Sequence, residues 1–155
     1  ERTGFPGMKI LQFAFNPEDE SIDSPHLAPH NSVMYTGTHD NNTVLGWYKD
    51  EIDDPTREYM AQYTNRKEYE TVPHAMLRTA FASVSYMAIA TMQDLLELDG
   101  SARMNLPSTI GGNWAWRMTA EELNPAVEEQ LYYLTKIYRR LNTDLIPQEN
   151  KRNTF

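Results

Sequence analysis

The sequence of 155 residues contains no cysteine, and this absence excludes both a disulfide framework and a thiolate metal site. A protein without disulfides suits the cytosol, which we expect as its location.

Positive charge is also scarce. The 14 Lys and Arg residues against 22 Asp and Glu give a formal net charge of −8, which argues against a nucleic-acid backbone or an anionic membrane as partner. No apolar run approaches the roughly 20 residues of a membrane span, and the first residues lack the order of a signal peptide.

What the sequence does contain is typical of one globular domain. Hydrophobic residues make up 40% and charged residues 23% of the chain, which is enough apolar material for a core. The chain starts at Glu1 and enters an apolar segment within a few residues, so we expect a piece of a longer protein. We expect residues 1–146 to form one unit and the polar stretch 147–155 to be a frayed tail.

Three short apolar segments predict the strands of a sheet. Residues 8–15 are almost continuously apolar, 33–36 form a shorter run, and 86–92 form a third run that leads into Gln93 and Asp94. Such runs fit strands that are buried on both faces, as in a parallel sheet.

Helices are predicted between and after these strands. Asp54-Pro55 supplies an N-cap and a first-turn proline for a helix that ends near Tyr63. A second helix is predicted over 73–86, with an apolar stripe at Leu77, Ala80, Phe81 and Val84. Asn124-Pro125 opens a last amphipathic helix over about 125–142. Strand–helix alternation of this kind predicts an α/β fold with a parallel sheet.

A dense polar cluster, Thr38-His39-Asp40-Asn41-Asn42, follows the second predicted strand. Side chains just past the carboxyl ends of parallel strands project into a shared mouth, so a carboxylate at Asp40 would face a ligand there. Asp and Asn are also common in Asx turns next to helix caps. The residues alone leave both interpretations open.

The long loop over 99–117 is rich in glycine, asparagine and tryptophan. Loops of this length in compact domains are usually functional or disordered. Tryptophan rings and asparagine amides suit sugar binding, through stacking and hydrogen bonds to hydroxyl groups. Trp114 or Trp116 would equally serve as an attachment of the loop to the core.

Neither a metal nor a cofactor is predicted. His26 and His30 have the spacing of a ligand pair on a helix, but Pro25 and Pro29 make a regular helix there unfavourable. No glycine-rich phosphate loop follows a strand and opens a helix.

Three blocks of the sequence, in the order of the family, together resemble the C-terminal part of the 4-α-glucanotransferases, also called amylomaltases or disproportionating enzymes. The blocks span 4–15 (Gly-Phe-Pro-Gly-Met-Lys-Ile-Leu-Gln-Phe-Ala-Phe), 35–41 (Tyr-Thr-Gly-Thr-His-Asp-Asn) and 93–114, from Gln93-Asp94 through Arg103-Met104-Asn105 to Gly112-Asn113-Trp114. The resemblance implies a (β/α)₈ TIM barrel in which this chain supplies about strands 6–8, at 8–15, 33–36 and 87–92, with their helices.

The resemblance also implies an activity. Members of the family cut an α-1,4 bond with retention and pass the glucan segment to another sugar hydroxyl, so maltooligosaccharides or α-1,4-glucans of starch, glycogen and maltodextrin metabolism would be the partners. Retention requires a nucleophile and an acid/base carboxylate about 5 Å apart. Both would lie upstream of Gly4. A third, transition-state-supporting carboxylate of the family matches Asp40, with His39 beside it.

Further residues are implied by position in the matching blocks. Asn113, Trp114, Asn105 and Gln93 would bind substrate, whereas Asp94 would fix the end of a strand. Two residues depart from the family pattern: Ser108 stands where a glycine is expected, and Asn42 where a second aspartate is usual.

The missing carboxylates predict that this chain alone does not catalyse. A stand-alone glucan-binding or assembly module, and another retaining α-glucan enzyme such as a hydrolase, remain alternatives. Three strands of a barrel leave two strand edges unpaired, so we also expect the isolated chain either to self-associate or to be soluble only with the missing half of the barrel.

Overall fold

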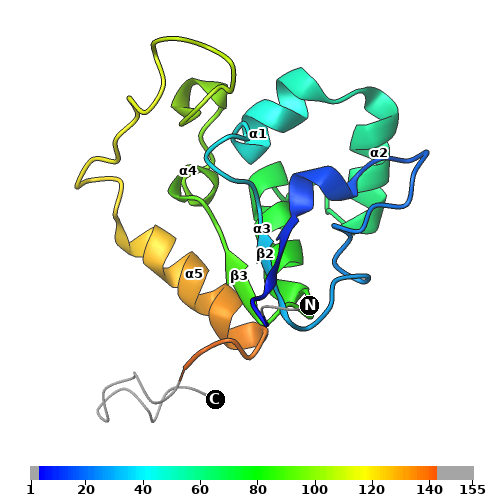
Figure 1. Ribbon diagram of the computed structural model, residues 1–155. Helices are drawn as coiled ribbons and strands as arrows, with labels where there is room; N and C mark the ends of the chain where they lie inside the picture. Colours follow the sequence, from blue (N-terminus) through cyan, green and yellow to red (C-terminus); the bar gives the residue numbers. More distant parts are fainter. Residues whose placement is uncertain (1–3, 143–155) are drawn as a thin grey trace, which may run out of the picture.

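The computed structural model in Figure 1 describes residues 4–142. A parallel sheet lies at its centre, with strands β1 (Gly7–Ile10), β2 (Ser32–Tyr35) and β3 (Met87–Ile89) in that order. The predicted α/β class with a parallel sheet is confirmed. The tail predicted at 147–155, and the end of the unit predicted over 1–146, lie outside the described residues.

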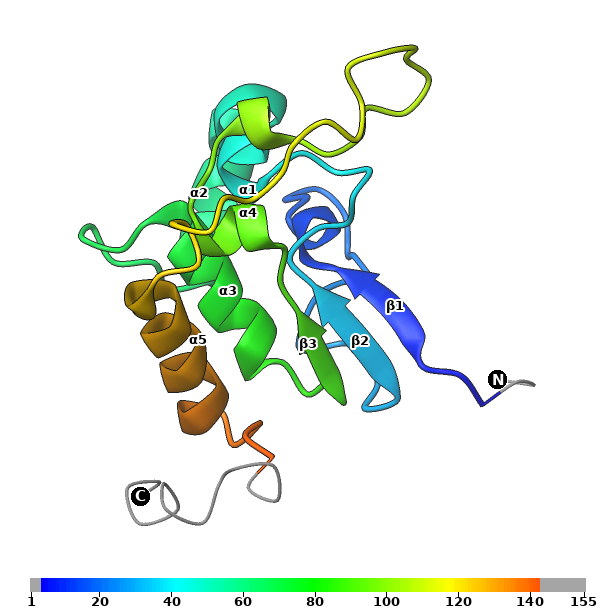
Figure 2. The same cartoon turned by 90° about the vertical axis from the view of Figure 1, so that its left-hand side faces the viewer.

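Helices follow each strand, and one face of the sheet is covered by α3 (Val72–Ala82). Figure 2 shows α3 beside the sheet and α5 on the outer side of α3. None of the helices in residues 4–142 is long and apolar enough to cross a bilayer. The other helical elements are the 3₁₀ helix η1 (Leu11–Ala14), α1 (Val44–Gly46), the π-helical turn η2 (Trp47–Glu51), α2 (Asp54–Tyr63), α4 (Met92–Leu95), the 3₁₀ helix η3 (Gly100–Ala102) and α5 (Pro125–Ile137).

The core consists of two clusters that meet at α3. Met76 and Ala80 of α3 belong to the first cluster, which contains Leu11, Ala14, Phe15, Ala28, Met34, Val44, Trp47, Met60 and Val72. Leu77 and Phe81 belong to the second, with Leu95, Val127 and Leu134. The predicted stripe on this helix is therefore buried at Leu77, Ala80 and Phe81, but Val84 lies beyond the helix and is 56% exposed.

The first apolar segment is not a strand over its whole length. β1 ends at Ile10, and the chain continues as η1 because Leu11 and Ala14 turn into the core while Phe13 stays exposed. Gln12 is also buried, and its amide donates a 2.9 Å hydrogen bond to the backbone oxygen of Asn42. A continuous strand over 8–15 would point these side chains to alternating faces.

The third apolar segment also ends earlier than predicted. β3 stops at Ile89, because the Thr91 hydroxyl accepts a 3.2 Å hydrogen bond from the N–H of Asp94 and starts α4. This contact is an ordinary N-cap.

The helix boundaries differ from the prediction in three places. Asp53, rather than Asp54, caps α2 by accepting from the N–H of Thr56. α3 ends at Ala82, where Arg140 donates to the last backbone oxygens. α5 begins at Pro125 as predicted but ends at Ile137 instead of near 142, and Arg139 beyond it has a φ of 56°. The predicted end of α2 at Tyr63 is confirmed.

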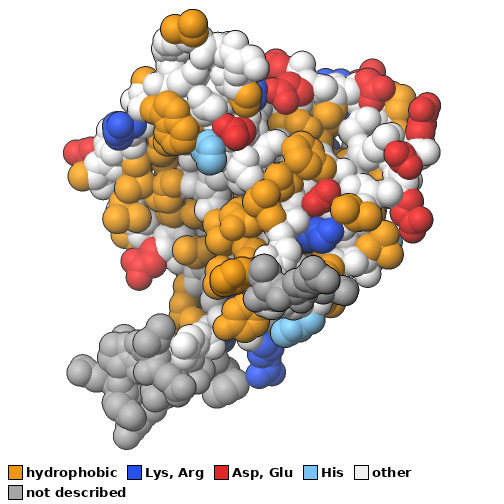
Figure 3. Space-filling view, in the orientation of Figure 1, with side chains coloured by type: hydrophobic (Ala, Val, Ile, Leu, Met, Phe, Trp, Pro, Cys, Tyr) orange, Lys and Arg blue, Asp and Glu red, His pale blue; other side chains and the backbone are white. Residues whose placement is uncertain are grey.

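The sheet face opposite α3 is apolar and partly uncovered. The strand register places six apolar side chains in two rows on this face: Met8, Val33 and Met87 form one row, and Ile10, Tyr35 and Ile89 form the other. Met8, Met87 and Ile89 are 59%, 45% and 37% exposed. Figure 3 shows the corresponding band of hydrophobic side chains across the middle of the molecule.

Candidate active site

Asp94 joins the carboxyl ends of β2 and β3. Its Oδ2 accepts a 2.6 Å hydrogen bond from the Thr36 hydroxyl, and its Oδ1 accepts a 2.8 Å bond from the N–H of Val44. Burial raises the pKa of the Asp94 carboxyl, and the hydrogen bonds from Thr36 and Val44 act in the opposite direction. The carboxyl was expected to fix a strand end, and its contacts hold the start and the end of the loop that follows β2.

This loop is a tight turn that places His39 and Asp40 at the surface. Asn41 Oδ1 accepts hydrogen bonds from the N–H and the hydroxyl of Thr38, at 2.9 and 2.8 Å, and Thr43 caps α1. The side chains of His39 and Asp40 are 56% and 50% exposed. The helix cap is therefore present, and the Asn41 side chain bonds back to Thr38 instead of forming an Asx turn. These contacts are made by the neighbours of Asp40, and its carboxylate stays half exposed.

Gly37 allows the Gln12 side chain to approach closely beneath the turn. A Cβ at this position would lie 2.7 Å from Gln12 Nε2, which donates to the backbone oxygen of Asn42. The buried Gln12 thereby joins η1 to the turn.

A second loop, which follows η3, meets the turn at Asp40. Asn105 Nδ2 donates a 2.6 Å hydrogen bond to Asp40 Oδ1, and the N–H of Asn105 donates to the backbone oxygen of His39 at 3.0 Å. His39 Nε2 lies 3.4 Å from the same carboxylate oxygen. The structure thus brings together three of the predicted site residues from two loops that are 65 residues apart.

Arg103 holds the two loops in this arrangement. Its Nε donates to the backbone oxygen of Asn105 at 2.9 Å, and its Nη2 donates to that of Asp40 at 2.7 Å. Its Nη1 pairs with Glu51 Oε1 at 2.9 Å. The same Oε1 also accepts a 2.9 Å bond from Asn42 Nδ2. An aspartate at position 42, which has no N–H to donate, could not make this contact.

Trp114 packs against His39 in a tilted arrangement. Their ring centroids are 5.1 Å apart with an interplanar angle of 37°. Trp114 has a φ of 62°, and its N–H donates to the backbone oxygen of Met104 at 2.7 Å. A positive φ is unusual for a bulky residue and is typical of functional sites. Trp114 is 53% exposed, so part of this residue remains accessible beside His39.

Asn113 and Gln93 lie apart from the carboxylate. Asn113 Oδ1 accepts from the N–H of Leu106 at 2.9 Å, and its Nδ2 donates to the Thr109 hydroxyl at 3.0 Å, so its side chain shapes its own loop. The Gln93 amide is buried and donates to the backbone oxygen of Ala102 at 3.3 Å. Substrate binding by these two residues stays a prediction.

A depression of about 210 Å³ adjoins the turn. Its walls are formed by Thr38, His39, Asn41, Asn42, Thr43, Thr91, Gln93, Arg103 and Met104, which include the predicted site residues His39 and Gln93. Of the residues around Asp40, His39 lines this depression, and Asp40, Asn105 and Trp114 contact His39 next to it. A carboxylate, an imidazole, an amide and an indole ring thus gather beside the depression, which suits a hydroxyl-rich ligand.

Within residues 4–142, no group of three or more His, Asp or Glu side chains is placed to hold a metal ion. His26 instead bonds to the Tyr63 hydroxyl at 2.8 Å, and His30 packs on Tyr86.

Comparison with known proteins decides the family. A family model described as 4-alpha-glucanotransferase matches residues 1–123, which is most of the chain. The chain belongs to the 4-alpha-glucanotransferase family. The resemblance inferred from the three sequence blocks is confirmed.

Relatives of this glucanotransferase chain are much longer. A 4-alpha-glucanotransferase of Streptococcus pneumoniae serotype 4 is 82% identical over 146 residues, covering 94% of this chain and 29% of that protein. The 4-alpha-glucanotransferase of Thermus thermophilus is 41% identical over 152 residues, covering 91% of this chain and 29% of that protein. The amylomaltase of Streptococcus agalactiae, solved in complex with acarbose, superposes with a TM-score of 0.87 at 42% identity and covers 91% of this chain and 28% of that one. The chain therefore spans less than a third of the length of these relatives.

Sequence reasoning did not assign roles to Arg103, Asn42 and Glu51, which hold the two loops of the candidate site together. Arg103 lies inside a block that carried the resemblance, but nothing in the block showed that its side chain reaches Asp40 and Glu51. Asn42 was noted only as a departure from the family pattern, and its contact with Glu51 spans nine residues. The sequence offered one signal for this contact: Asn42, which departs from the family pattern, is followed nine residues later by Glu51.

Proposed function

We propose that this chain is part of a 4-α-glucanotransferase that transfers α-1,4-glucan segments between maltooligosaccharides by a retaining double displacement. The observation that supports the proposal most directly is the convergence of Asp40, His39 and Asn105 beside the Trp114 ring at the carboxyl ends of the strands. Catalytic residues of parallel barrels lie at this end.

In this proposal Asp40 supports the transition state. An oxocarbenium-like transition state is electron-poor, so hydrogen bonds from its ring hydroxyls to a carboxylate strengthen as charge develops. Asn105 occupies Asp40 Oδ1. Among residues 4–142, Oδ2 has no hydrogen-bond partner and is available to a sugar hydroxyl. His39 donates to a second hydroxyl, and the exposed part of Trp114 stacks on a sugar ring.

We further propose that β1, β2 and β3 are strands 6–8 of a (β/α)₈ barrel. The two apolar rows on the partly uncovered sheet face then belong to the barrel interior, where side chains of neighbouring strands pack in layers. β1 and β3 each pair only with β2 among the described residues, so each has one free edge. The remaining strands of the barrel would cover both edges. In their absence, the isolated chain would self-associate through these edges.

The proposal can be tested by replacing the matched segment of the S. pneumoniae relative with this chain. The chimera should convert maltotriose into glucose and longer maltooligosaccharides. Asp40→Asn in the chimera should lower kcat on the order of 10²–10³-fold while it leaves the fold intact. Asp50→Asn, which changes an exposed carboxylate outside the site, is the matched control and should keep full activity.

Two outcomes of this experiment would contradict the proposal. Equal activity of the Asp40→Asn and Asp50→Asn chimeras would remove Asp40 from the reaction. Release of glucose without longer products would identify a hydrolase, because water rather than a sugar would then capture the intermediate.

The isolated chain provides a second test. We propose that the nucleophile and the acid/base lie outside it, and catalytic carboxylates of this kind act as a unit, so it should release no product from maltotriose. Binding of maltooligosaccharides without turnover by a chain that also fails in the chimera would favour the alternative of a non-catalytic glucan-binding or assembly module. Turnover by the isolated chain would show that it carries its own nucleophile.

A further inference from the structure

A second groove lies between the loop that precedes α3 and the helix α5. Its volume is about 510 Å³, within the range of about 300–1,000 Å³ that is common for small-molecule sites. It shares no residue with the depression beside Asp40. The groove is lined by Asn65, Lys67, Tyr69, Glu70, Thr71, His74, Arg78, Glu97 and Tyr133.

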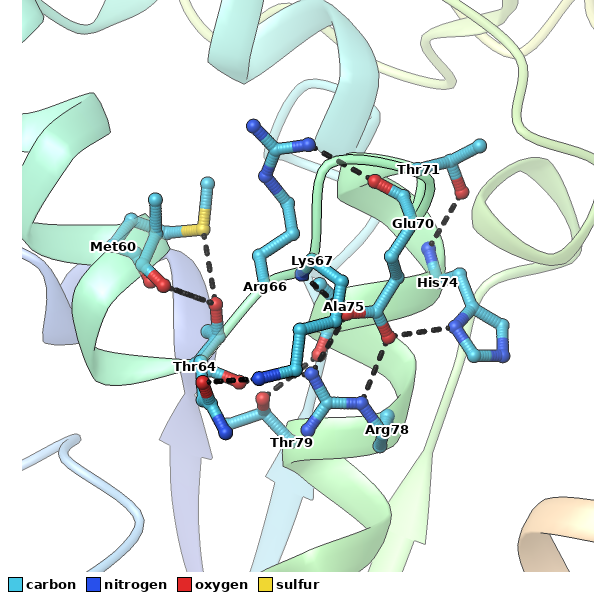
Figure 4. A network of polar contacts seen from close by, with 12 residues as sticks. Met60, Thr64, Arg66, Lys67, Glu70, Thr71, His74, Ala75, Arg78 and Thr79 are labelled. Atoms are coloured by element: carbon cyan, nitrogen blue, oxygen red, sulfur yellow. Dashed lines mark hydrogen bonds and ion pairs between the residues drawn. The ribbon is translucent and has the colours of Figure 1, made fainter.

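The floor of the groove is fixed by the network in Figure 4. The Glu70 side chain is only 8% exposed and accepts from Arg78 Nε at 2.8 Å and from Arg78 Nη2 at 2.9 Å. His74 Nδ1 lies 2.9 Å from the same carboxylate, and Arg66 Nη1 donates to the backbone oxygen of Glu70 at 2.9 Å. The loop over 65–71 is therefore held in one conformation without a ligand, which reduces the entropy cost of binding.

Two tyrosines stand at the walls of this fixed floor. Tyr69 is 90% exposed on the loop, and Tyr133 is 56% exposed on α5. A tyrosine ring offers an apolar face with little side-chain entropy to lose, and its hydroxyl remains available for hydrogen bonds. Sugars need both properties, because their C–H faces stack on rings while their hydroxyls require polar partners.

The charges of the groove favour a neutral ligand. Lys67 and Arg78 are balanced by Glu70 and Glu97, and Arg78 is already paired with Glu70. An anion would meet two carboxylates, and a cation would meet two basic groups, so neither is selected.

Asn65 and Glu97 have φ values of 51° and 56° because each is the left-handed residue that ends a helix. The N–H of Arg66 donates to the backbone oxygen of Ala61 at the end of α2, and the N–H of Leu98 donates to that of Gln93 at the end of α4, so the backbone of the groove is fixed at both points.

We propose that this groove binds a segment of an α-1,4-glucan chain, with Tyr69 and Tyr133 stacking on glucose rings and Asn65, Lys67 and Glu97 bonding to their hydroxyls. The choice of an α-glucan over other neutral sugars rests on the proposed function. The groove would hold part of a long polysaccharide substrate at a place other than the depression beside Asp40.

Titration of the ¹⁵N-labelled chain with maltoheptaose tests this proposal. Backbone signals of Tyr69, Glu97 and Tyr133 should shift saturably. Tyr69→Ala should weaken this response about tenfold, and Tyr69→Phe should restore most of it, because the ring supplies the stacking. Tyr69 is almost fully exposed, so neither variant should disturb the fold. Tyr132→Ala, a change of an exposed neighbour on α5 that does not line the groove, is the matched control.

The same spectra separate the two sites. Signals of Asp40 and Trp114 report on the candidate active site, and they should respond equally in the wild type and in Tyr69→Ala. If they stay unchanged while the groove signals shift, the groove proposal stands and the active-site assignment fails for this chain. If maltoheptaose leaves the groove signals unchanged, or if inorganic phosphate alone shifts them saturably, the groove is not a glucan site.

Discussion

The buried Glu70 carboxylate should make the stability of the chain strongly dependent on acid pH, and Glu70→Gln should remove this dependence. Hydrogen bonds from Arg78 lower the pKa of Glu70 from 4.5 to about 2, with a smaller contribution from His74 and against the effect of burial. The carboxylate also accepts from the N–H of Lys67 at 3.4 Å. Glutamine keeps the shape of the side chain but removes the charge that pairs with the Arg78 guanidinium.

The magnitude follows from the two pKa values of Glu70. Their difference of about 2.5 pH units, at about 1.4 kcal/mol per unit, corresponds to about 3 kcal/mol of unfolding free energy. A carboxyl whose folded pKa is depressed contributes this stability fully above its unfolded pKa of about 4.5. The contribution is lost as the pH falls from about 4.5 to about 2. Glu70→Gln should therefore be less stable than wild type by up to about 3 kcal/mol at pH 7, and nearly equal to it at pH 2.

Urea unfolding at pH 7, 4 and 2, at one fixed protein concentration, measures this difference. Glu68→Gln removes an exposed carboxylate on the same loop and is the control, with an expected change within about 0.5 kcal/mol at each pH. A deficit of Glu70→Gln that is the same at pH 7 and pH 2 would refute the reasoning, because the loss would then come from packing rather than from ionisation.

Three other substitutions have expected effects on stability. Gly46→Ala would place a Cβ 2.5 Å from Asn42 Oδ1 and 2.8 Å from Gly100 Cα, so urea unfolding should show a loss of about 1–3 kcal/mol in unfolding free energy. An unchanged urea midpoint would mean that η3 moves freely to make room. Ser108 has a φ of 65°, so Ser108→Gly should raise the unfolding free energy by up to about 1 kcal/mol, and a lower thermal midpoint would contradict this. Arg140 donates to three backbone oxygens at the end of α3 at 2.7–3.1 Å, so Arg140→Met should lower the unfolding free energy by about 2 kcal/mol. A loss of less than about 0.5 kcal/mol would show that water replaces these hydrogen bonds.

The order of strands and helices could be predicted from the sequence, because it depends on local hydrophobic patterns. The ends of the elements could not. Strand β1 stops early because the chain turns into η1, which buries Leu11 and Ala14 and brings Gln12 to the backbone oxygen of Asn42, thirty residues further along the chain. Strand β3 stops early because Thr91 caps α4. These causes are packing and polar contacts of particular residues, which leave no trace in periodicity.

The candidate site, too, could be predicted from the sequence only in part. The position of Asp40 after a strand predicted that its carboxylate would be accessible, and the structure places it at the surface. Its partner Asn105 comes from a loop 65 residues away, and only the family resemblance had placed both residues in one site. The φ of Ser108 also gives a physical reason for the glycine expected there, since glycine adopts that conformation without strain.

The position of α3 between the two core clusters has a consequence for how the chain unfolds. Two neighbouring sides of this one helix belong to different clusters, so neither cluster can open without exposing residues that pack against the other. We therefore expect amide hydrogen exchange to protect β2, α3 and α4 with one common opening free energy. Asp94 bonds Thr36 and Val44 across the junction of these elements, so the turn that carries Asp40 depends on the same opening. Local fraying should leave the Asp40 turn intact, and loss of its geometry should require the cooperative transition of the whole chain.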